Sequence, residues 1–382
     1  MKVLFVSRGL GVGIGYRVNS ISHYNALLNA VGEDNVVTVD LLFEGKYVKT
    51  KEALCYKEPT LLRQKVKRLF EFNRTSISNQ IMYDILEAIQ KYHIDIVYID
   101  DATYGKLTRM IKQRYSNIPV ITFYHDIVKK MYLKFVLQRP VFLIQAFASI
   151  YGEKVNTKYG DVHITLNPRD TKQLEQYYGI KANYEMPVCT GKVHEAPSIE
   201  RCNDIILLFV GAKYIPNVKG IKWFYENVFE KLDNRCQLYV VGWQMEFLQE
   251  SMMHERVHVF GSVPSLEEYY RKASVIIGPI FEGGGMKVKT AEALSFGKFF
   301  VGTQESLEGY YDYTNETVRN YIKQANNAEE FVYTINKAVK EGINNYYPEI
   351  ASYYNEHYSE DALNNQMKMI IEKTAILLKQ GD

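Results

Sequence analysis

Short apolar runs alternate with longer amphipathic stretches along the whole chain of 382 residues. The runs rich in β-branched residues lie at 2–7, 36–40, 94–99, 119–123, 162–165, 205–210, 237–241, 257–260, 275–278 and 299–302. Between them, stretches such as 83–92 and 218–232 place apolar residues at helical spacing. This alternation is typical of parallel sheets that helices cover on both faces. We therefore predict an α/β fold built from Rossmann-like, doubly wound domains.

A linker divides the chain into two halves of similar pattern. Residues 186–198 mix Pro187, Gly191 and Pro197 with polar residues and show no periodicity. At roughly 150 residues per domain, the length suits two domains. A last helix over 359–379 carries apolar residues on one side and needs a surface to cover.

Composition excludes several classes of protein. The net charge of +2 gives no bulk electrostatic reason to bind nucleic acid. The four cysteines form no C-x-x-C pair and the histidines no cluster, so we predict no disulfide scaffold and no metal site. The most apolar stretch, 140–151, is shorter than the ~20 residues that cross a bilayer. We predict a cytoplasmic protein.

Alternating glycines follow the first predicted strand, and a helix is expected to begin near Tyr16. Gly11, Gly13 and Gly15 would let the backbone approach a diphosphate or an acceptor closely. The dinucleotide fingerprint, with glycines at i, i+2 and i+5, is not matched. Asp40 ends the second strand, where a dehydrogenase places its ribose acid, so an NAD-dependent enzyme stays an alternative. A tight turn without a ligand is another.

A second glycine-rich loop, 279–287, leads from a strand into a helix. It contains Gly283, Gly284 and Gly285, and two lysines and a glutamate follow, namely Lys287, Lys289 and Glu292. A helix N-terminus and two cations favour an anion, and a carboxylate can accept hydrogen bonds from paired hydroxyls. We predict that the glycines and lysines bind a diphosphate and that Glu292 binds a ribose. The alternative is a surface pair of Lys289 and Glu292 at i,i+3 spacing.

Several segments together resemble the donor half of retaining GT-B-fold glycosyltransferases, the group called family 4 or group 1. The segments of the donor half are 209–218, 269–279, 292–298 and 301–303, together with the second glycine loop, and 161–167 is similar to the last strand of the family's first domain. The resemblance implies two Rossmann-like domains that face a cleft, and a C-terminal helix that crosses back to the first domain. On this basis, 1–187 is the acceptor domain, 188–358 is the nucleotide-sugar domain, and 359–382 packs on the first domain.

The same resemblance implies roles for single residues. Glu292 matches the second glutamate of the family's E-x7-E motif, and Gly284 stands eight residues earlier, where the first is expected. Either Glu282 binds the sugar from a longer loop, or glycine N–H groups do so. Lys213 and Lys219 lie near the family's basic pair, which implies that Lys213 assists catalysis with Lys289 and that Lys219 binds the donor.

A histidine of the first half ends a predicted strand. Related enzymes often place a polar residue there that orients the acceptor hydroxyl, and His125 can donate or accept a proton near neutral pH. We predict that His125 is catalytic; a structural histidine is the alternative.

Two segments of the first half, 61–74 and 127–139, mix cations with apolar residues. Basic amphipathic helices can lie on anionic lipid, so we predict peripheral contact with the inner face of the cell membrane. Ordinary helices with one face on the core are the alternative.

The combined prediction is a retaining glycosyltransferase without cofactor or metal. It would move a sugar from a nucleoside diphosphate donor, with a UDP-sugar favoured, to a glycan or lipid-linked precursor of a bacterial surface polysaccharide such as a capsule. The alternatives are a nucleotide-sugar epimerase of the same fold, a catalytically silent binding partner and the NAD-dependent enzyme.

Overall fold

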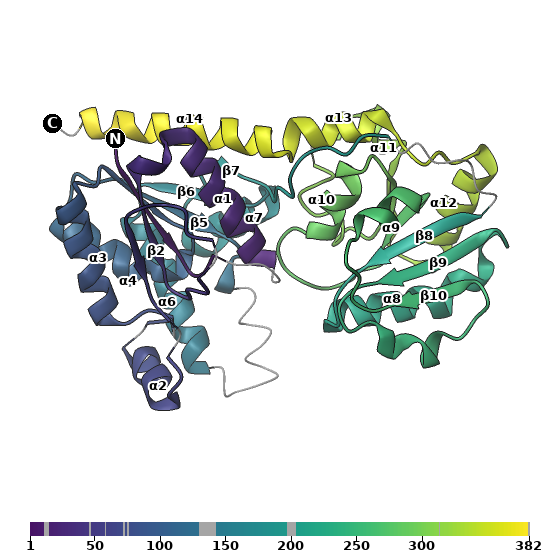
Figure 1. The fold of residues 1–382 in the computed structure, drawn as a ribbon, viewed down its shortest axis with the longest axis horizontal. Coiled ribbons are helices and arrows are strands. Elements are labelled where there is room, and N and C mark those ends of the chain that lie inside the picture. Colours follow the sequence, from purple (N-terminus) through teal and green to yellow (C-terminus); the bar gives the residue numbers. More distant parts are fainter. Residues whose placement is uncertain are drawn as a thin grey trace. The chain divides into compact units, whose positions relative to one another are not determined.

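The computed structural model describes residues 1–382 except 11–14, 46, 58, 72, 75, 130–142, 197–203, 313 and 381–382. Its contacts divide the chain into two compact units (Figure 1). The first unit contains Met1–Pro187 and Glu360–Asp382, and the second contains Val188–Ser359.

The first unit is built on a parallel sheet of seven strands. In chain order these are β1 (Val3–Ser7), β2 (Val36–Asp40), β3 (Ala53–Cys55), β4 (Ile96–Ile99), β5 (Val120–Tyr124), β6 (Val162–Thr165) and β7 (Tyr184–Glu185). Their order across the sheet is β3-β2-β1-β4-β5-β6-β7. The direction of winding therefore reverses between β1 and β4, and ligands of doubly wound sheets bind beyond the strand ends at such a point.

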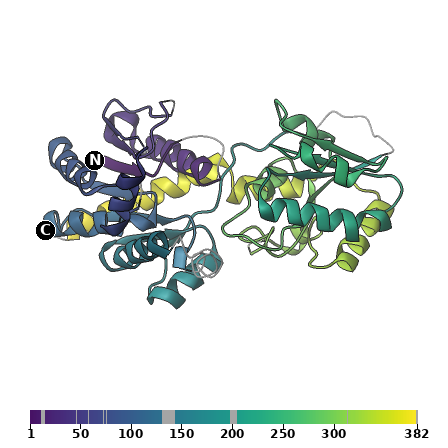
Figure 2. The same ribbon diagram turned by 90° about the horizontal axis from the view of Figure 1, so that it is seen from below.

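Helices cover both faces of this sheet. They are α1 (Gly15–Val31), α3 (Asn79–Tyr92), α4 (Gly105–Arg114), α6 (Leu143–Tyr159), α7 (Pro168–Tyr178) and α14 (Glu360–Gln380), with the 3₁₀ turns η1 (Glu33–Asn35) and η2 (Ala102–Tyr104). The helix α2 (Leu62–Phe70) packs on α6 instead. Along β1, Leu4 and Val6 join the core formed with α3 and α4. Phe5, which points the other way, contacts Tyr24 of α1. The helix α14 lies beside α1 (Figures 1 and 2).

The second unit is built on a parallel sheet of six strands. They are β8 (Ile205–Val210), β9 (Cys236–Val241), β10 (Val257–Phe260), β11 (Val275–Gly278), β12 (Phe299–Gly302) and β13 (Ile322–Gln324). Across the sheet they run β10-β9-β8-β11-β12-β13. Here the winding reverses between β8 and β11.

The helices of the second unit bring its loops close together at this reversal. They are α8 (Ile215–Asn227), α9 (Glu267–Lys272), α10 (Val288–Ser295), α11 (Glu316–Arg319), α12 (Ala328–Glu341) and α13 (Pro348–His357), with η4 (Phe229–Lys231), η5 (Glu246–Leu248) and η6 (Glu250–Met252). A Cβ atom on Gly220 of α8 would collide with the carbonyl oxygen of Pro279. Glycine at this position therefore lets α8 approach the loop that follows β11.

The predicted fold class is confirmed, because each unit is a doubly wound parallel sheet with helices. All ten predicted strands are present, and the ends of four of them differ by one or two residues. The prediction of one helix over 218–232 was wrong. The structure has α8, which starts earlier with Pro216 in its first turn, and then the separate turn η4.

Candidate functional site

A side-chain hydrogen bond joins the helices α8 and α10 at the reversal of the second sheet. The Nζ of Lys289, in the first turn of α10, donates to Oδ1 of Asn217 at 2.6 Å. The Nδ2 of Asn217 in turn donates to the carbonyl of Ala212, after β8, at 2.9 Å. The ammonium also lies over the ring of Phe209, 4.7 Å from its centroid. Lys289 is thus held beyond the ends of β8 and β11, where doubly wound sheets bind ligands.

The surroundings of Lys289 disfavour its charge. Burial is the main cause that lowers the pKa of Lys289 to about 7; repulsion from Lys287 adds to it, and attraction to Glu292 opposes it. Asn217 supplies a neutral oxygen, so the lysine gains a hydrogen bond without a countercharge. A diphosphate would supply that charge, because an opposite charge within a few ångströms favours the charged form.

Lys287 has a different environment from Lys289. Its Nζ donates to Oε1 of Glu305 at 2.7 Å and to the carbonyls of Gly285 at 2.9 Å and Gly284 at 3.2 Å. Three acceptors use the three N–H groups of an ammonium. Gly283 and Gly285 have φ angles of 153° and 59°, which favour glycine. Lys287 therefore shapes the glycine loop, and Glu305 is a partner that the sequence did not indicate.

Glu292 is also set by a residue from another element. Its Oε2 accepts a hydrogen bond of 2.9 Å from the hydroxyl of Tyr270 on α9. Burial raises the pKa of Glu292, while the bond from Tyr270 and the charge of Lys289 oppose the rise. Glu292 thus bonds Tyr270, and Lys289 bonds Asn217. The structure therefore does not have the simple surface pair of Lys289 and Glu292 that was the alternative. Tyr270 lies 22 residues earlier in the chain, so no local spacing could have revealed it.

The other candidates of this unit lie at its surface. Lys219 and Glu282 form an ion pair of 2.7 Å with side chains 67% and 53% exposed, so both can turn toward a ligand. The Nζ of Lys213 lies over the ring of Phe247, 4.5 Å from its centroid. The structure brings Lys219 to Glu282, and it places Lys213 against the turn that follows β9.

In the first unit, His125 follows β5 and belongs to a cluster that the sequence did not reveal. Its Nε2 lies 2.9 Å from the backbone oxygen of Asp100 and 3.3 Å from Oδ2 of that residue. The other carboxylate oxygen lies 2.8 Å from Nδ1 of His23 on α1. Asp100 follows β4 at the reversal of the first sheet. The two aspartates that stand directly after this strand, Asp100 and Asp101, were the sequence feature that could have indicated the cluster.

The first glycine loop is described only in part. Gly11 and Gly13 lie outside the described residues, and Gly15 begins α1. Asp40, the acid on which the NAD alternative depended, is 1% exposed, and its carboxylate accepts the backbone N–H of Leu42 at 3.1 Å. Its carboxylate is therefore committed to the protein backbone, which weakens that alternative.

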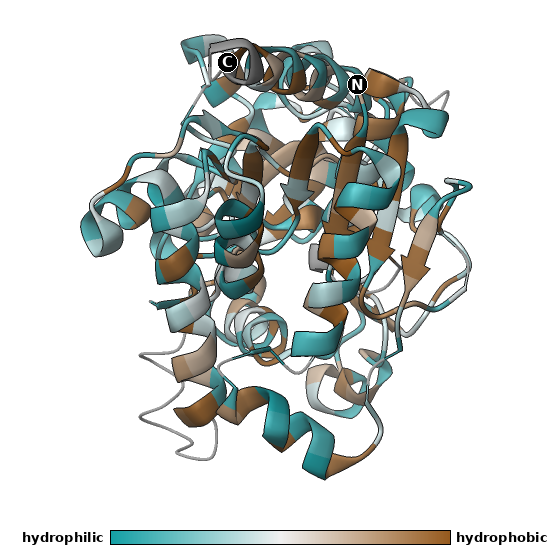
Figure 3. Cartoon of the chain, turned by 90° about the vertical axis from the view of Figure 1, so that its left-hand side faces the viewer, coloured by the Kyte–Doolittle hydropathy of each residue, from teal (hydrophilic) through white to brown (hydrophobic). Residues whose placement is uncertain are grey.

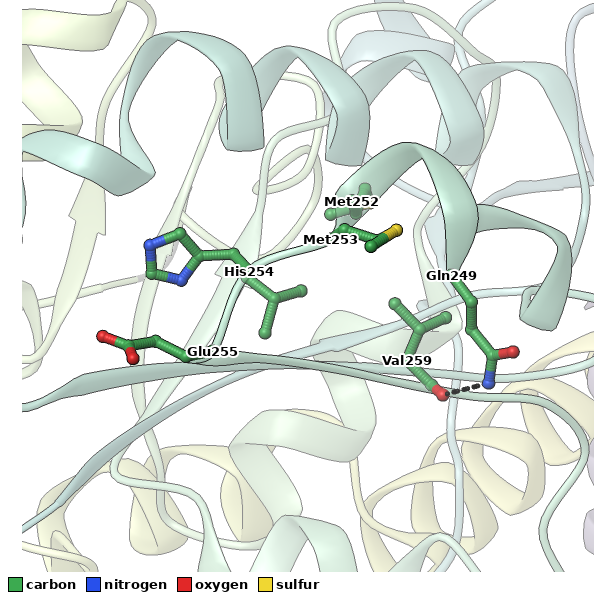
Figure 4. A pocket seen from close by; sticks show the side chains of 7 residues that line it. Gln249, Met252, Met253, His254, Glu255 and Val259 are labelled. Carbon is green, nitrogen blue, oxygen red and sulfur yellow. Dashed lines mark hydrogen bonds between the residues drawn. The ribbon is translucent and has the colours of Figure 1, made fainter.

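A hollow of about 530 Å³ lies beside the edge strand β10 (Figure 4). Its lining residues are Gln249, Met252, Met253, His254, Glu255, Val257 and Val259. The amide of Gln249 donates to the carbonyl of Val259 at 3.1 Å. None of the predicted site residues lines this hollow, so it is separate from the candidate site. In the described part of the chain, no group of three or more His, Cys, Asp or Glu side chains could hold a metal.

Comparison with protein families gives a match over residues 204–341, to the family described as glycosyl transferases group 1. The second unit is a group 1 glycosyltransferase domain. The predictions of family and enzyme class are thereby confirmed, and among the alternatives a transferase is favoured over an epimerase. A comparison with curated proteins gives no match.

Solved structures share the fold of this glycosyltransferase over the whole chain. The lipopolysaccharide outer core galactosyltransferase WaaB is 15% identical with a TM-score of 0.69, covering 99% of this chain and 100% of WaaB. Anabaena HepE in complex with UDP is 11% identical with a TM-score of 0.68, covering 98% of this chain and 100% of HepE. Sucrose-phosphate synthase from Thermosynechococcus elongatus is 15% identical with a TM-score of 0.67, at 97% and 98% coverage. The GT-B fold is thus confirmed.

Proposed function

We propose that this glycosyltransferase moves a sugar from a UDP-sugar to a glycan acceptor with retention of configuration. The observation that carries the proposal is the bond between Lys289 and Asn217 at the reversal of the second sheet, which holds the ammonium on a neutral amide oxygen. HepE, with the same fold, has been solved with UDP and with UDP-glucose. The division of roles follows the predicted domains: the acceptor in 1–187 with 359–382, and the donor in 188–358.

Each residue of the glycine loop has a role in this proposal. Lys289 and the N–H groups of Gly283, Gly284 and Gly285 bind the diphosphate. Lys287 fixes the loop through Glu305 and adds positive potential nearby. Glu292, oriented by Tyr270, accepts hydrogen bonds from the ribose hydroxyls.

The remaining candidates act around the transferred sugar. Glu282, paired with Lys219, contacts sugar hydroxyls once the donor draws Lys219 toward its phosphates. Lys213 lies on the turn after β8 and adds charge on the same side of the sheet. In the first unit His125 binds an oxygen of the reacting groups.

The reaction breaks the bond between the anomeric carbon and the diphosphate oxygen, and the electron pair stays on the diphosphate. The acceptor hydroxyl oxygen then bonds to the anomeric carbon on the same face. Its proton passes to the departing phosphate oxygen, so the step needs no second carboxylate. Preorganised donors stabilise the charge that develops on the diphosphate, which is the task proposed for Lys289 and the glycine loop.

We expect UDP to protect the protein from thermal unfolding and Glu292→Gln to weaken that protection. A ligand at 100 times its Kd adds about 2.7 kcal/mol to the free energy of unfolding. The amide that replaces the carboxylate in this variant can accept at only one atom, and hydrogen bonds to charged groups contribute roughly 1.5–3 kcal/mol. The Kd for UDP should therefore rise by one to two orders of magnitude.

Glu268→Gln is the matched control, because Glu268 pairs with Lys272 at the surface of the same unit. It should leave the Kd for UDP unchanged. An unchanged Kd in Glu292→Gln would reject the ribose role. UDP binding without transfer to any glycan would point to the silent binding partner, and donor turnover without an acceptor to the epimerase.

The proposed acceptor is lipid-linked, because the first unit presents a basic apolar face. Its exposed apolar residues come from α2 and from the start of α6, which pack together, namely Leu61, Leu62, Val66, Phe70, Leu143, Ile144 and Phe147. Exposed Arg63 and Lys67 lie among them on α2. Figure 3 shows apolar and polar residues side by side along α2, at the lower end of this unit. The exposed residues of α2 support this proposal for the segment 61–74. Of the segment 127–139, Ile127 and Val128 are buried, and 130–139 lies outside the described residues.

This face suits the inner surface of the cell membrane, where precursors of surface polysaccharides such as a capsule are assembled on lipid. No helix in the described part of the chain is long and apolar enough to cross a membrane. The contact that we propose is peripheral, with about 1 kcal/mol from each cation near anionic lipid and further energy from buried apolar area.

We expect the protein to float with liposomes that contain anionic lipid and to stay behind with purely zwitterionic ones. The double variant Leu62→Ser with Phe70→Ser should lose most of this binding, because these side chains are 75% and 66% exposed and contribute apolar area to the lipid rather than to the core. Flotation at low salt measures the bound fraction.

Met253→Ser is the matched control, since Met253 is 78% exposed but belongs to the second unit. It should float like the wild type. Absence of wild-type binding at low salt would contradict membrane attachment without affecting UDP binding.

A further inference from the structure

A buried carboxylate lies between two histidines at the reversal of the first sheet. Asp100 is fully buried, and each of its carboxylate oxygens faces a histidine nitrogen: Nδ1 of His23 at 2.8 Å and Nε2 of His125 at 3.3 Å. The Nε2 of His125 also lies 2.9 Å from the backbone oxygen of Asp100. The backbone oxygen and the Oδ2 of Asp100 both act as acceptors, so Nε2 of His125 carries a hydrogen.

The charges of this cluster must nearly cancel. A buried ionised carboxylate is costly unless a cation pairs with it. One of the two histidine rings is therefore a charged imidazolium, and the other is a neutral imidazole. The ring of His23 is fully buried and packs edge-on against Phe123, with centroids 4.3 Å apart. The ring of His125 is 16% exposed. Because the ring of His125 is the more exposed of the two, its charged form keeps more of its hydration. The additional proton therefore lies on His125.

The second nitrogen of His23 supports the same distribution. Among the described residues its Nε2 has no hydrogen-bond partner although it is buried, and the same holds for both amide atoms of Asn19, one helical turn earlier on α1. An unpartnered lone pair costs less in such surroundings than an unpartnered, charged N–H group. His23 is therefore neutral, with its hydrogen on Nδ1 and directed to Asp100.

We infer that Asp100 and His23 are positioning residues that hold His125 as an imidazolium whose Nε2–H is bound to Asp100. The role at a ligand rests on the proposed function. In that role His125 donates a hydrogen bond and positive charge to an oxygen of the reacting groups. It does not remove the proton of the acceptor hydroxyl, which narrows the role that the sequence predicted.

The direction of the pKa shifts agrees with this geometry. Burial lowers the pKa of His23. Burial also acts against the charge of His125, but the carboxylates of Asp100 and Asp101 outweigh it and raise the pKa of His125. Among the described residues, the charged and titratable groups that act on His125 include these two aspartates, from the segment after β4, and His23 from α1.

Nitrogen NMR of the histidine side chains in the full chain tests the inference directly. At pH 7 we expect both nitrogens of His125 to be protonated and His23 to be neutral with its hydrogen on Nδ1. His125→Gln and His23→Gln assign the two signals. A wild-type His125 that is neutral at pH 7, or a charged His23, would overturn the inference, and this result does not depend on any variant of Asp100.

Asp100→Asn removes the carboxylate and should lower the pKa of His125 by at least one unit, which is a tenfold change in its protonation equilibrium. Asp101→Asn is the matched control. Asp101 accepts the backbone N–H of Thr103 at 2.9 Å instead of bonding His125, so its loss should shift the pKa of His125 less. Equal shifts in the two variants would contradict the inference.

Activity and ligand binding separate this inference from the proposed function. His23→Gln keeps a donor for Asp100, so it should move the pH dependence of kcat without abolishing transfer, a change that a purely structural role would not cause. UDP protection should be the same in Asp100→Asn and in the wild type, because the UDP site is proposed in the second unit. If UDP does not protect the wild-type protein from thermal unfolding, the proposed function is rejected, whereas the NMR result is unaffected.

Discussion

Lys289→Ala is expected to lower kcat by about two orders of magnitude or more. Removing one preorganised donor from a developing oxyanion typically costs ~3–4 kcal/mol of transition-state stabilisation. Lys289 is such a donor because Asn217 fixes its ammonium at 2.6 Å before any ligand arrives. The charge on the diphosphate grows as the anomeric bond breaks, so kcat falls, and KM rises because the ammonium also binds the diphosphate of the donor before the reaction. Steady-state kinetics with a UDP-sugar and its acceptor measure both parameters.

Two comparisons keep this result specific. Lys272→Ala removes a surface lysine of the same unit, whose partner is Glu268, and it should leave kcat unchanged. The melting temperature of Lys289→Ala shows whether the variant is folded. A folded Lys289→Ala protein with turnover close to the wild type would remove Lys289 from the catalytic machinery.

The strand pattern predicted the folds of both units because a buried parallel strand is a nearly continuous apolar run. The three strands that were missed, β3, β7 and β13, are edge strands of two or three residues. Each is at least partly exposed and shorter than the runs of about 4–8 residues by which strands are recognised in a sequence.

The glycine loop was predictable because glycines, cations and a helix start lie within a few residues. The sequence could not distinguish its two lysines, since they lie two positions apart and have the same chemistry. The structure separates them by their partners: Lys287 bonds Glu305 and the loop carbonyls, and Lys289 bonds Asn217, which is 72 residues away.

In the first unit, the partners of His125 likewise could not be predicted from the sequence. His125 could be singled out because it ends a strand, whereas its partners Asp100 and His23 lie 25 and 102 positions earlier. Their approach depends on strand order, since β4 neighbours both β1 and β5. Without that order, a histidine in the middle of a helix is indistinguishable from a core residue.

The affinity for UDP is expected to fall as the pH rises through 7, because Lys289 must be charged to bind a diphosphate. Burial lowers the pKa of Lys289 to about 7 in the protein without nucleotide. A diphosphate beside it would raise that pKa by roughly one to three units. Between the two values each binding event takes up a proton. By linkage, the Kd should then rise up to about tenfold per pH unit above 7.

Isothermal titration calorimetry in buffers of different ionisation enthalpy measures this proton uptake together with the Kd. The matched variant is Lys289→Arg, which keeps the positive charge but cannot lose its proton in this range. Its Kd should stay flat between pH 7 and 9, so the difference from the wild type isolates Lys289 from other groups that titrate. A wild-type Kd that is independent of pH, or an equal slope in Lys289→Arg, would show that the diphosphate does not meet the Lys289 ammonium. The shifted lysine thus becomes a direct probe of where the phosphates bind, because among the lysines of the glycine loop Lys289 bonds a neutral amide while Lys287 bonds a carboxylate.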